Sequence, residues 1–193
     1  MTSGLAHSRR AWWRRRRARA AAAATMAVMA LLLAGCGNAG AGAAIAPRQM
    51  SVGSQAFSQN VLPQRYTCRG GSVTPPLDWS GAPAGTKSIA IVVDDSSAPI
   101  TPFIYWLVFH LGPGTTDIQE GRLPAGARQA QNSEGIVGYD APCPNGHPHS
   151  YRFTVYALST MLSLPAGAPL QTVWTAIAAA TIGRGRIVVT GNP

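Results

Sequence analysis

Side chains that could do chemistry are concentrated in two short segments of this 193-residue chain. The first is Asp94-Asp95-Ser96-Ser97, and the second is His147-Pro148-His149-Ser150-Tyr151. A serine near a histidine and an aspartate could act as the nucleophile of a hydrolase, and two nearby histidines could bind a metal ion. Each of these hypotheses depends on the way in which the fold positions the two segments.

The hydrolase hypothesis makes Ser96 or Ser97 the nucleophile, His149 the base and Asp95 its partner. The chain has no G-x-S-x-G sequence of the kind that forms a nucleophile elbow. Neither serine has a base beside it in the sequence, so the hypothesis requires a serine hydroxyl within hydrogen-bond reach of His149. We therefore expect no catalytic residues and no enzymatic activity.

The metal hypothesis depends on His147 and His149, which are two residues apart. Pro148 disfavours the regular strand that would place both imidazoles on one face, and no third ligand is evident. We expect neither a metal ion nor a cofactor. The two aspartates also have a purely structural interpretation, because Asp94 and Asp95 could cap a turn after a strand.

The elements that must position these side chains are mostly strands. Three segments are short, rich in β-branched and aromatic residues, and bounded by Gly, Pro or Ser. They are residues 87–93, 104–111 and 151–158, and residues 185–189 are a shorter fourth candidate. One helix is predicted over residues 170–182, opened by Pro169, with an apolar stripe at Leu170, Val173, Trp174 and Ile177 that should face the core.

Fifteen prolines and 21 glycines interrupt these short strands. A parallel sheet would need a helix in every crossover, so the pattern predicts a mainly β fold, an antiparallel sandwich with one or two short helices. The connections at residues 112–136 and 138–150 are long, and ordered loops of that length often carry a site.

The net charge of +9 belongs mainly to the first nineteen residues, which hold seven arginines and no acid. From Cys36 onward there are nine basic and seven acidic residues, 9 − 7 = +2. A nucleic-acid-binding surface needs its basic residues spread over one face of a folded domain, so we expect no nucleic-acid partner.

The arginines are followed by fifteen apolar residues, 20–34, which are too few and too weakly hydrophobic for a membrane span. This pattern predicts an export signal over residues 1–35. Its end, Leu33-Ala34-Gly35-Cys36, resembles a bacterial lipobox, which implies that Cys36 becomes a lipidated N-terminus. An alternative is an N-terminal helix with a buried free cysteine. Ser8-Arg9-Arg10 leaves the twin-arginine and general secretory routes both open.

The predicted organisation then has two further parts. Residues 36–49 would be the lipidated cysteine and a flexible Gly/Ala tether, and residues 50–193 would be one folded domain. We expect the domain to lie outside the cytoplasm, anchored to the cell membrane. Cys68 and Cys143 remain there, and export permits a disulfide between them, although two unrelated buried thiols are an alternative.

A series of motifs in residues 57–189 resembles the phosphatidylethanolamine-binding protein family, in its bacterial Raf-kinase-inhibitor-like branch. The motifs are Tyr66-Thr67-Cys68-Arg69-Gly70, Thr74-Pro75-Pro76-Leu77-Asp78-Trp79, Asp94-Asp95-Ser96-Ser97-Ala98-Pro99, Tyr105-Trp106 and the segment from Pro142 to Tyr151. The resemblance implies a large antiparallel sheet packed on a smaller one, with a small anion pocket at one end. It also implies that Cys68 and Cys143 pair and hold the proline-rich loop beside that pocket.

The resemblance assigns pocket residues position by position. Asp95, Pro99, His149 and Tyr151 match the family's motifs, and Pro142 belongs to the proline-rich loop. Tyr105 stands where a histidine is usual, and Ser96 and Ser97 replace a proline and an aspartate. Imidazole and phenol groups can hold a phosphate or carboxylate, so these departures predict an altered specificity, with a pocket that has lost its ligand as the alternative.

The function that these features predict is a membrane-anchored, non-catalytic binding protein for a small phosphate or head-group anion. It could act as an inhibitor or scaffold for a protein partner. One alternative is an inhibitor of a protease or other protein that acts through surface loops such as residues 112–136. The Ser/His hydrolase is the other.

Overall fold

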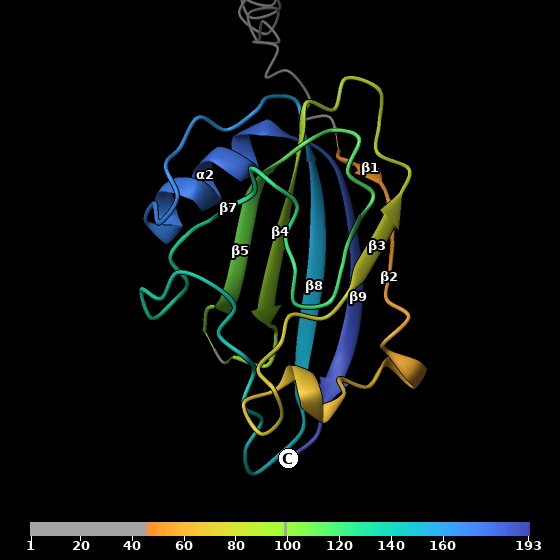
Figure 1. Ribbon diagram of the computed structural model, residues 1–193, viewed down its shortest axis with the longest axis vertical. Helices are drawn as coiled ribbons and strands as arrows, with labels where there is room; N and C mark the ends of the chain where they lie inside the picture. Colours follow the sequence, from red (N-terminus) through yellow and green to blue (C-terminus); the bar gives the residue numbers. More distant parts are fainter. Residues whose placement is uncertain (1–45, 99) are drawn as a thin grey trace, which may run out of the picture. The chain divides into compact units, whose positions relative to one another are not determined.

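A six-stranded sheet forms the centre of the part of the chain that the computed structural model describes, residues 46–98 and 100–193 (Figure 1). Its order is β1-β9-β8-β4-β5-β7, antiparallel throughout except for β1, which pairs with β9 in parallel. The strands are β1 (Arg48–Gln49), β4 (Ser88–Asp95), β5 (Phe103–Leu111), β7 (Arg128–Gln129), β8 (His149–Leu158) and β9 (Thr181–Gly191).

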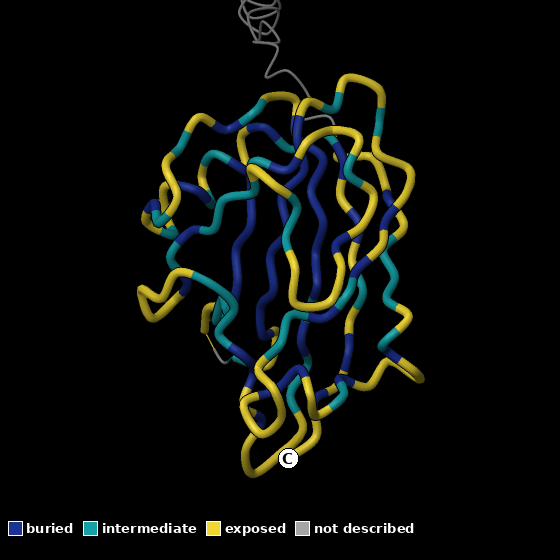
Figure 2. Tube along the Cα trace, in the orientation of Figure 1, coloured by how far each residue is buried: buried dark blue, intermediate teal, exposed yellow. Residues whose placement is uncertain are grey.

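A smaller antiparallel sheet packs on one face of the large one. It contains β2 (Ser51–Gly53), β3 (Leu77–Ser80) and β6 (Asp117–Ile118) in the order β2-β3-β6. Trp79 and Ile118 of the small sheet share a buried cluster with Ile91 and Phe153 of the large sheet. In Figure 2 this buried interior follows the central strands, and exposed loops surround it.

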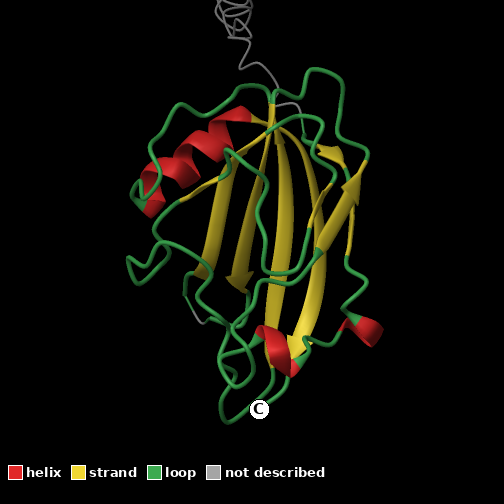
Figure 3. Cartoon of the chain, viewed as in Figure 1, coloured by secondary structure: helices red, strands yellow, loops and turns green. Residues whose placement is uncertain are grey.

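Helix α2 (Leu170–Ala180) covers part of the opposite face of the large sheet (Figure 3). It follows Pro169 and buries Val173 and Ile177 against apolar side chains of β4, β5 and β8. Two short turns of 3₁₀ helix, η1 (Ser58–Asn60) and η2 (Gln64–Tyr66), complete the helical structure of the described residues.

The predicted fold class is confirmed, since the described chain is a sandwich of a larger and a smaller sheet with one α-helix. The structure differs in the length of the last strand, where β9 covers Thr181–Gly191 rather than residues 185–189. Glycines weaken the strand pattern there, and packing requires them: a Cβ on Gly185 would lie 2.5 Å from the Met50 carbonyl oxygen. Arg48 and Gln49, expected in the tether, pair with β9 as β1.

Residues 46–193 form a compact unit that contains both buried clusters and the disulfide. Among the residues described, no helix is both long and apolar enough to cross a membrane. The predicted export signal, the lipobox cysteine Cys36 and most of the tether lie outside the described residues, as does Pro99.

Candidate functional site

The predicted site residues meet at one end of the large sheet, where β4 ends and β8 begins. Asp95 is the last residue of β4 and lies directly opposite Tyr151 of β8. His149 begins β8, and its register partner on β9 is Gly191. Strand β1 pairs at the other end of β9, at Gly183, about 25 Å away at the usual rise of a strand. The site is therefore remote from the point where the chain enters the domain (Figure 1).

Asp95 holds His149 in a fixed orientation. The Asp95 side chain is buried, and its Oδ2 atom lies 2.7 Å from His149 Nδ1. A carboxylate has no proton to donate, so Nδ1 is the donor and His149 Nε2 is the nitrogen turned away from Asp95. Asp95 Oδ1 accepts a hydrogen bond from the Ser97 backbone N–H at 2.7 Å. Asp95 therefore caps a turn, as its structural interpretation predicted, and also orients an imidazole.

Two buried polar atoms of the site have no hydrogen-bond partner among the described residues. They are His149 Nε2 and the hydroxyl oxygen of Tyr151, which the Tyr105 hydroxyl approaches closely enough to affect the Tyr151 pKa. The two rings are nearly parallel, with centroids 6.0 Å apart and planes at 10°. Buried polar atoms are nearly always satisfied in folded proteins, so this pair points to a partner from outside the chain. With both nitrogens protonated, His149 would present an N–H donor and a positive charge beside the phenol.

Tyr105 reaches the site because β5 has a bulge. Val93 pairs with Trp106 whereas Asp94 pairs with Ile104, so Tyr105 is the extra residue. A bulge redirects side chains, and Tyr105 and Trp106 both pack in the cluster between the sheets. The Tyr105 and Tyr151 rings meet edge to face at 5.7 Å. Burial and the negative charge of Asp95 raise the pKa of Tyr105 to about 12, so its phenol remains a hydrogen-bond donor at neutral pH.

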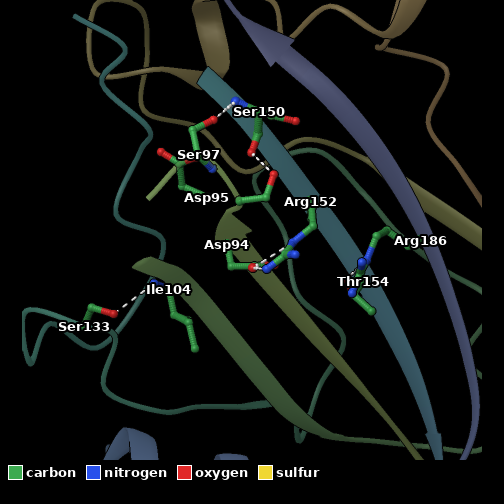
Figure 4. A network of polar contacts seen from close by, with 10 residues as sticks. Asp94, Asp95, Ser97, Ile104, Ser133, Ser150, Arg152, Thr154 and Arg186 are labelled. Atoms are coloured by element: carbon green, nitrogen blue, oxygen red, sulfur yellow. Dashed lines mark hydrogen bonds and ion pairs between the residues drawn. The ribbon is translucent and has the colours of Figure 1, made fainter. Parts of the chain in front are cut away.

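The serines of the first segment are bound to the backbone of Ser150 (Figure 4). Ser96 Oγ donates to the Ser150 carbonyl oxygen at 2.9 Å, and Ser97 Oγ accepts from the Ser150 N–H at 2.9 Å. Their hydroxyls therefore join the loop after β4 to the start of β8. Neither has a hydrogen bond to His149, which is the contact that the hydrolase hypothesis requires.

The remaining predicted site residues have other surroundings. Pro142 is buried, and its carbonyl oxygen accepts a hydrogen bond from Cys68 N at 3.1 Å, so its place at the site stays a prediction. His147 is exposed and stacks on His149 with ring centroids 4.7 Å apart. Within residues 46–98 and 100–193, no three His, Cys, Asp or Glu side chains lie close enough to hold a metal ion.

A disulfide joins Cys68 to Cys143, as predicted from the resemblance. A hydrogen bond also connects the two segments that precede the cysteines. The Tyr139 hydroxyl, before Cys143, donates to the Tyr66 carbonyl oxygen, before Cys68, at 2.8 Å. The proline-rich loop that leads into His149 is thus covalently attached to the η2 region.

Two residues next to Tyr151 were missed by the sequence analysis. A Cβ on Gly191 would lie 2.5 Å from Cε2 of Tyr151 and 3.4 Å from Cγ of Pro144. Gly191 therefore packs directly against the ring that presents the unpartnered hydroxyl, and Pro144 lies close to Gly191. The sequence offers no sign of this, because Gly191 is near the C-terminus and far in sequence from both neighbours.

We predict that Gly191→Ala displaces the Tyr151 ring and lowers the free energy of unfolding by about 1–3 kcal/mol, the usual effect of overpacking a core. Urea unfolding of the variant measures this. Gly114→Ala is the control, because a Cβ there meets no atom within 4 Å. Equal stability of Gly191→Ala and Gly114→Ala would contradict the tight packing around Tyr151.

Comparison with known proteins identifies relatives of this chain. The family model described as phosphatidylethanolamine-binding protein matches residues 52–192. A UPF0098 protein of Methanothermobacter thermautotrophicus is 37% identical over 145 residues, covering 72% of this chain and 96% of that protein. A protein named lipoprotein LppC, from Mycobacterium tuberculosis, is 38% identical over 148 residues, covering 75% of this chain and 73% of its own length.

Two solved structures are similar throughout the described domain. YbcL of E. coli, described as a member of the mammalian PEBP family, has a TM-score of 0.69 and 28% identity, covering 75% of this chain and 98% of its own. The PEBP homologue CT736 of Chlamydia trachomatis has a TM-score of 0.67 and 32% identity, with coverages of 74% and 97%.

Proposed function

Because the chain belongs to the phosphatidylethanolamine-binding protein family, we propose that it is a membrane-anchored, non-catalytic protein that binds a small phosphate- or carboxylate-bearing ligand. The ligand would lie against His149, Tyr151 and Tyr105. The observation that carries the proposal is the pair of buried, unpartnered atoms, His149 Nε2 and the Tyr151 hydroxyl. Both atoms can donate to an anion once the imidazole carries its second proton.

The character of the ligand follows from the donors. The Asp95 carboxylate lies beside His149 and offsets a positive charge on the imidazole, and the two tyrosines contribute neutral donors. A histidine in place of Tyr105 could have added a second positive charge. The site therefore favours a singly charged anion, such as a carboxylate or a phosphodiester, over a phosphate dianion.

The absence of a catalytic role is supported by the two serine contacts. Ser96 and Ser97 use their hydroxyls to fix the Ser150 backbone, so neither is presented to His149 as a nucleophile. The arrangement has donors for an anion and no activated group to attack it.

We test the site with residues 46–193 in calorimetric titrations against inorganic phosphate, phosphoethanolamine, nucleotides and small carboxylates. His149→Ala should abolish saturable binding, because it removes the charged donor. Asn145→Ala is the control, since it removes an exposed polar side chain of the same loop, and it should retain most of the affinity. Binding that survives in His149→Ala, or no binding of any anion to the unaltered domain, would refute the proposed site.

Membrane anchoring is proposed through Cys36, and the lipoprotein name of the LppC relative supports it. In a bacterial host, the full chain should incorporate a labelled fatty acid and partition into the detergent phase of a Triton X-114 extract. Cys36→Ser removes the sulfur that would accept the lipid, so label and partitioning should both be lost. Retention of both by Cys36→Ser would show that the anchor lies elsewhere.

A further inference from the structure

A groove lies on the other face of the large sheet, between helix α2 and strands β4, β8 and β9. Its volume is about 700 Å³, within the range of small-molecule sites. We call it the arginine groove and define it by Arg152, Arg184, Arg186, Tyr156, Trp174 and Ile104, which line it. Neighbouring residues of a strand point to opposite faces, so Asp94 and Arg152 line this groove whereas Asp95 and Tyr151 serve the anion site.

Two arginines of the groove have no acidic partner in the part of the chain that the structure describes. Arg184 and Arg186 project from the same face of β9, about 7 Å apart along the strand, opposite Tyr156 and Thr154 of β8. Arg186 Nε donates to Thr154 Oγ1 at 2.9 Å, which fixes the direction of its guanidinium (Figure 4).

Arg152 differs from these two, because its guanidinium binds the Asp94 carboxylate, with Nε 2.9 Å from Oδ2. Three arginines and one aspartate give the groove a net charge of 3 − 1 = +2. Burial raises the pKa of Tyr156, and the positive charges of Arg186 and Arg184 oppose that rise.

The opposite wall of the groove is apolar. Leu170, Trp174 and Ile177 of α2 line it, together with Ile104 of β5. The Trp174 ring meets the Tyr156 ring edge to face at 6.2 Å, so the aromatic wall reaches the arginines. A concave site with unpaired guanidinium groups on one side and hydrocarbon on the other matches a molecule with an acidic head and an apolar body.

We propose that the arginine groove binds an anionic amphiphile with a single hydrocarbon chain, such as an alkyl phosphate or a fatty acid. The head would bind Arg184 and Arg186, and the chain would lie against Trp174 and Ile104. Arginines on a flat face of the sheet would serve only to keep the domain soluble. Arg184 and Arg186 instead border a cavity with an apolar wall, and solubility alone would not require such a cavity.

The position of the groove indicates where its ligand comes from. Pro47 lines the groove and lies only eleven positions after Cys36, a reach of at most about 40 Å. If Cys36 carries the lipid anchor proposed above, a tether of this length keeps the groove within reach of the membrane, so lipid of the bilayer is one source of the amphiphile. The membrane as the source of the ligand rests on the proposed anchor, whereas binding in the groove does not.

We test the groove by calorimetry with decyl phosphate, decanol and inorganic phosphate, using residues 46–193 that carry His149→Ala so that the anion site does not contribute. Decyl phosphate alone should bind. The double substitution Arg184→Gln/Arg186→Gln should weaken it about tenfold or more, because charge-assisted bonds to the head are lost. Arg122→Gln is the control, since Arg122 is exposed and outside the groove.

A second variant provides an independent test if Arg184→Gln/Arg186→Gln does not fold. Ala178 is an exposed residue of α2 that lines the groove, so Ala178→Glu keeps the helix and adds a negative charge that should repel the head. Absence of decyl phosphate binding, or binding unchanged in both variants, would overturn the proposal without affecting the anion site.

Vesicles distinguish the two sources of the amphiphile. Vesicles of phosphatidylcholine with lysophosphatidylglycerol, which has an anionic head and a single hydrocarbon chain, are compared with vesicles of phosphatidylcholine alone. Binding to the anionic vesicles that Arg184→Gln/Arg186→Gln abolishes would support lipid of the bilayer as the source, and binding of monomeric decyl phosphate alone would support a free amphiphile. Binding to anionic vesicles that neither groove variant weakens, without monomer binding, would overturn the groove.

Discussion

Loss of the disulfide through Cys68→Ser/Cys143→Ser should lower the free energy of unfolding of residues 46–193 by about 4 kcal/mol. The bond joins residues 75 positions apart, so it restricts about half of the unfolded domain. Urea unfolding of the double variant and the oxidised protein measures the difference. A stability loss of this size is a large fraction of the total for a domain of this length.

The same variant separates two roles of the disulfide. The Cys68 N–H to Pro142 carbonyl bond and the Tyr139 hydroxyl to Tyr66 carbonyl bond also connect the two loops. If these bonds suffice to hold the loop, anion affinity of the folded variant should be unchanged even though its stability falls. Weaker binding would show that the disulfide also positions His149. Equal stability with and without the disulfide would contradict the prediction.

The strands that could be predicted from the sequence are those whose own residues favour an extended backbone. Strands β4, β5 and β8 are rich in β-branched and aromatic residues, and they form the centre of the sheet. Strands β1 and β6 are two residues long and exist because a neighbour pairs with them. Such short pairings depend on the tertiary fold, so local sequence does not reveal them.

Part of the candidate site was accessible from the sequence and part was not. Asp95, His149 and Tyr151 were identified by family resemblance, and in the structure Tyr151 and Arg152 of β8 lie on opposite faces of the sheet. The bulge that turns Tyr105 into the site depends on the pairing of β4 with β5. The packing of Gly191 against Tyr151 depends on contact between distant segments. Neither could be read from local patterns.

The two adjacent aspartates of β4 offer the sharpest test of the anion site, because they face opposite sides of the sheet. Asp95→Asn should weaken binding of the best anion about tenfold to a hundredfold, in line with about 1.5–3 kcal/mol for a hydrogen bond to a charged group. An amide at residue 95 replaces the charged acceptor of the hydrogen bond that orients His149, whose Nδ1 lies 2.7 Å from the carboxylate. Calorimetric titration measures the change.

Asp94→Asn is the matched control, since it removes the same charge one residue earlier. Asp94 binds Arg152 in the arginine groove, so its substitution should leave anion affinity at His149 unchanged. It should instead strengthen binding of decyl phosphate, because it raises the net charge of the groove and frees Arg152. Tighter anion binding in Asp95→Asn would mean that this carboxylate repels the ligand more than it supports His149, and the ligand would then not be an anion held by the imidazolium.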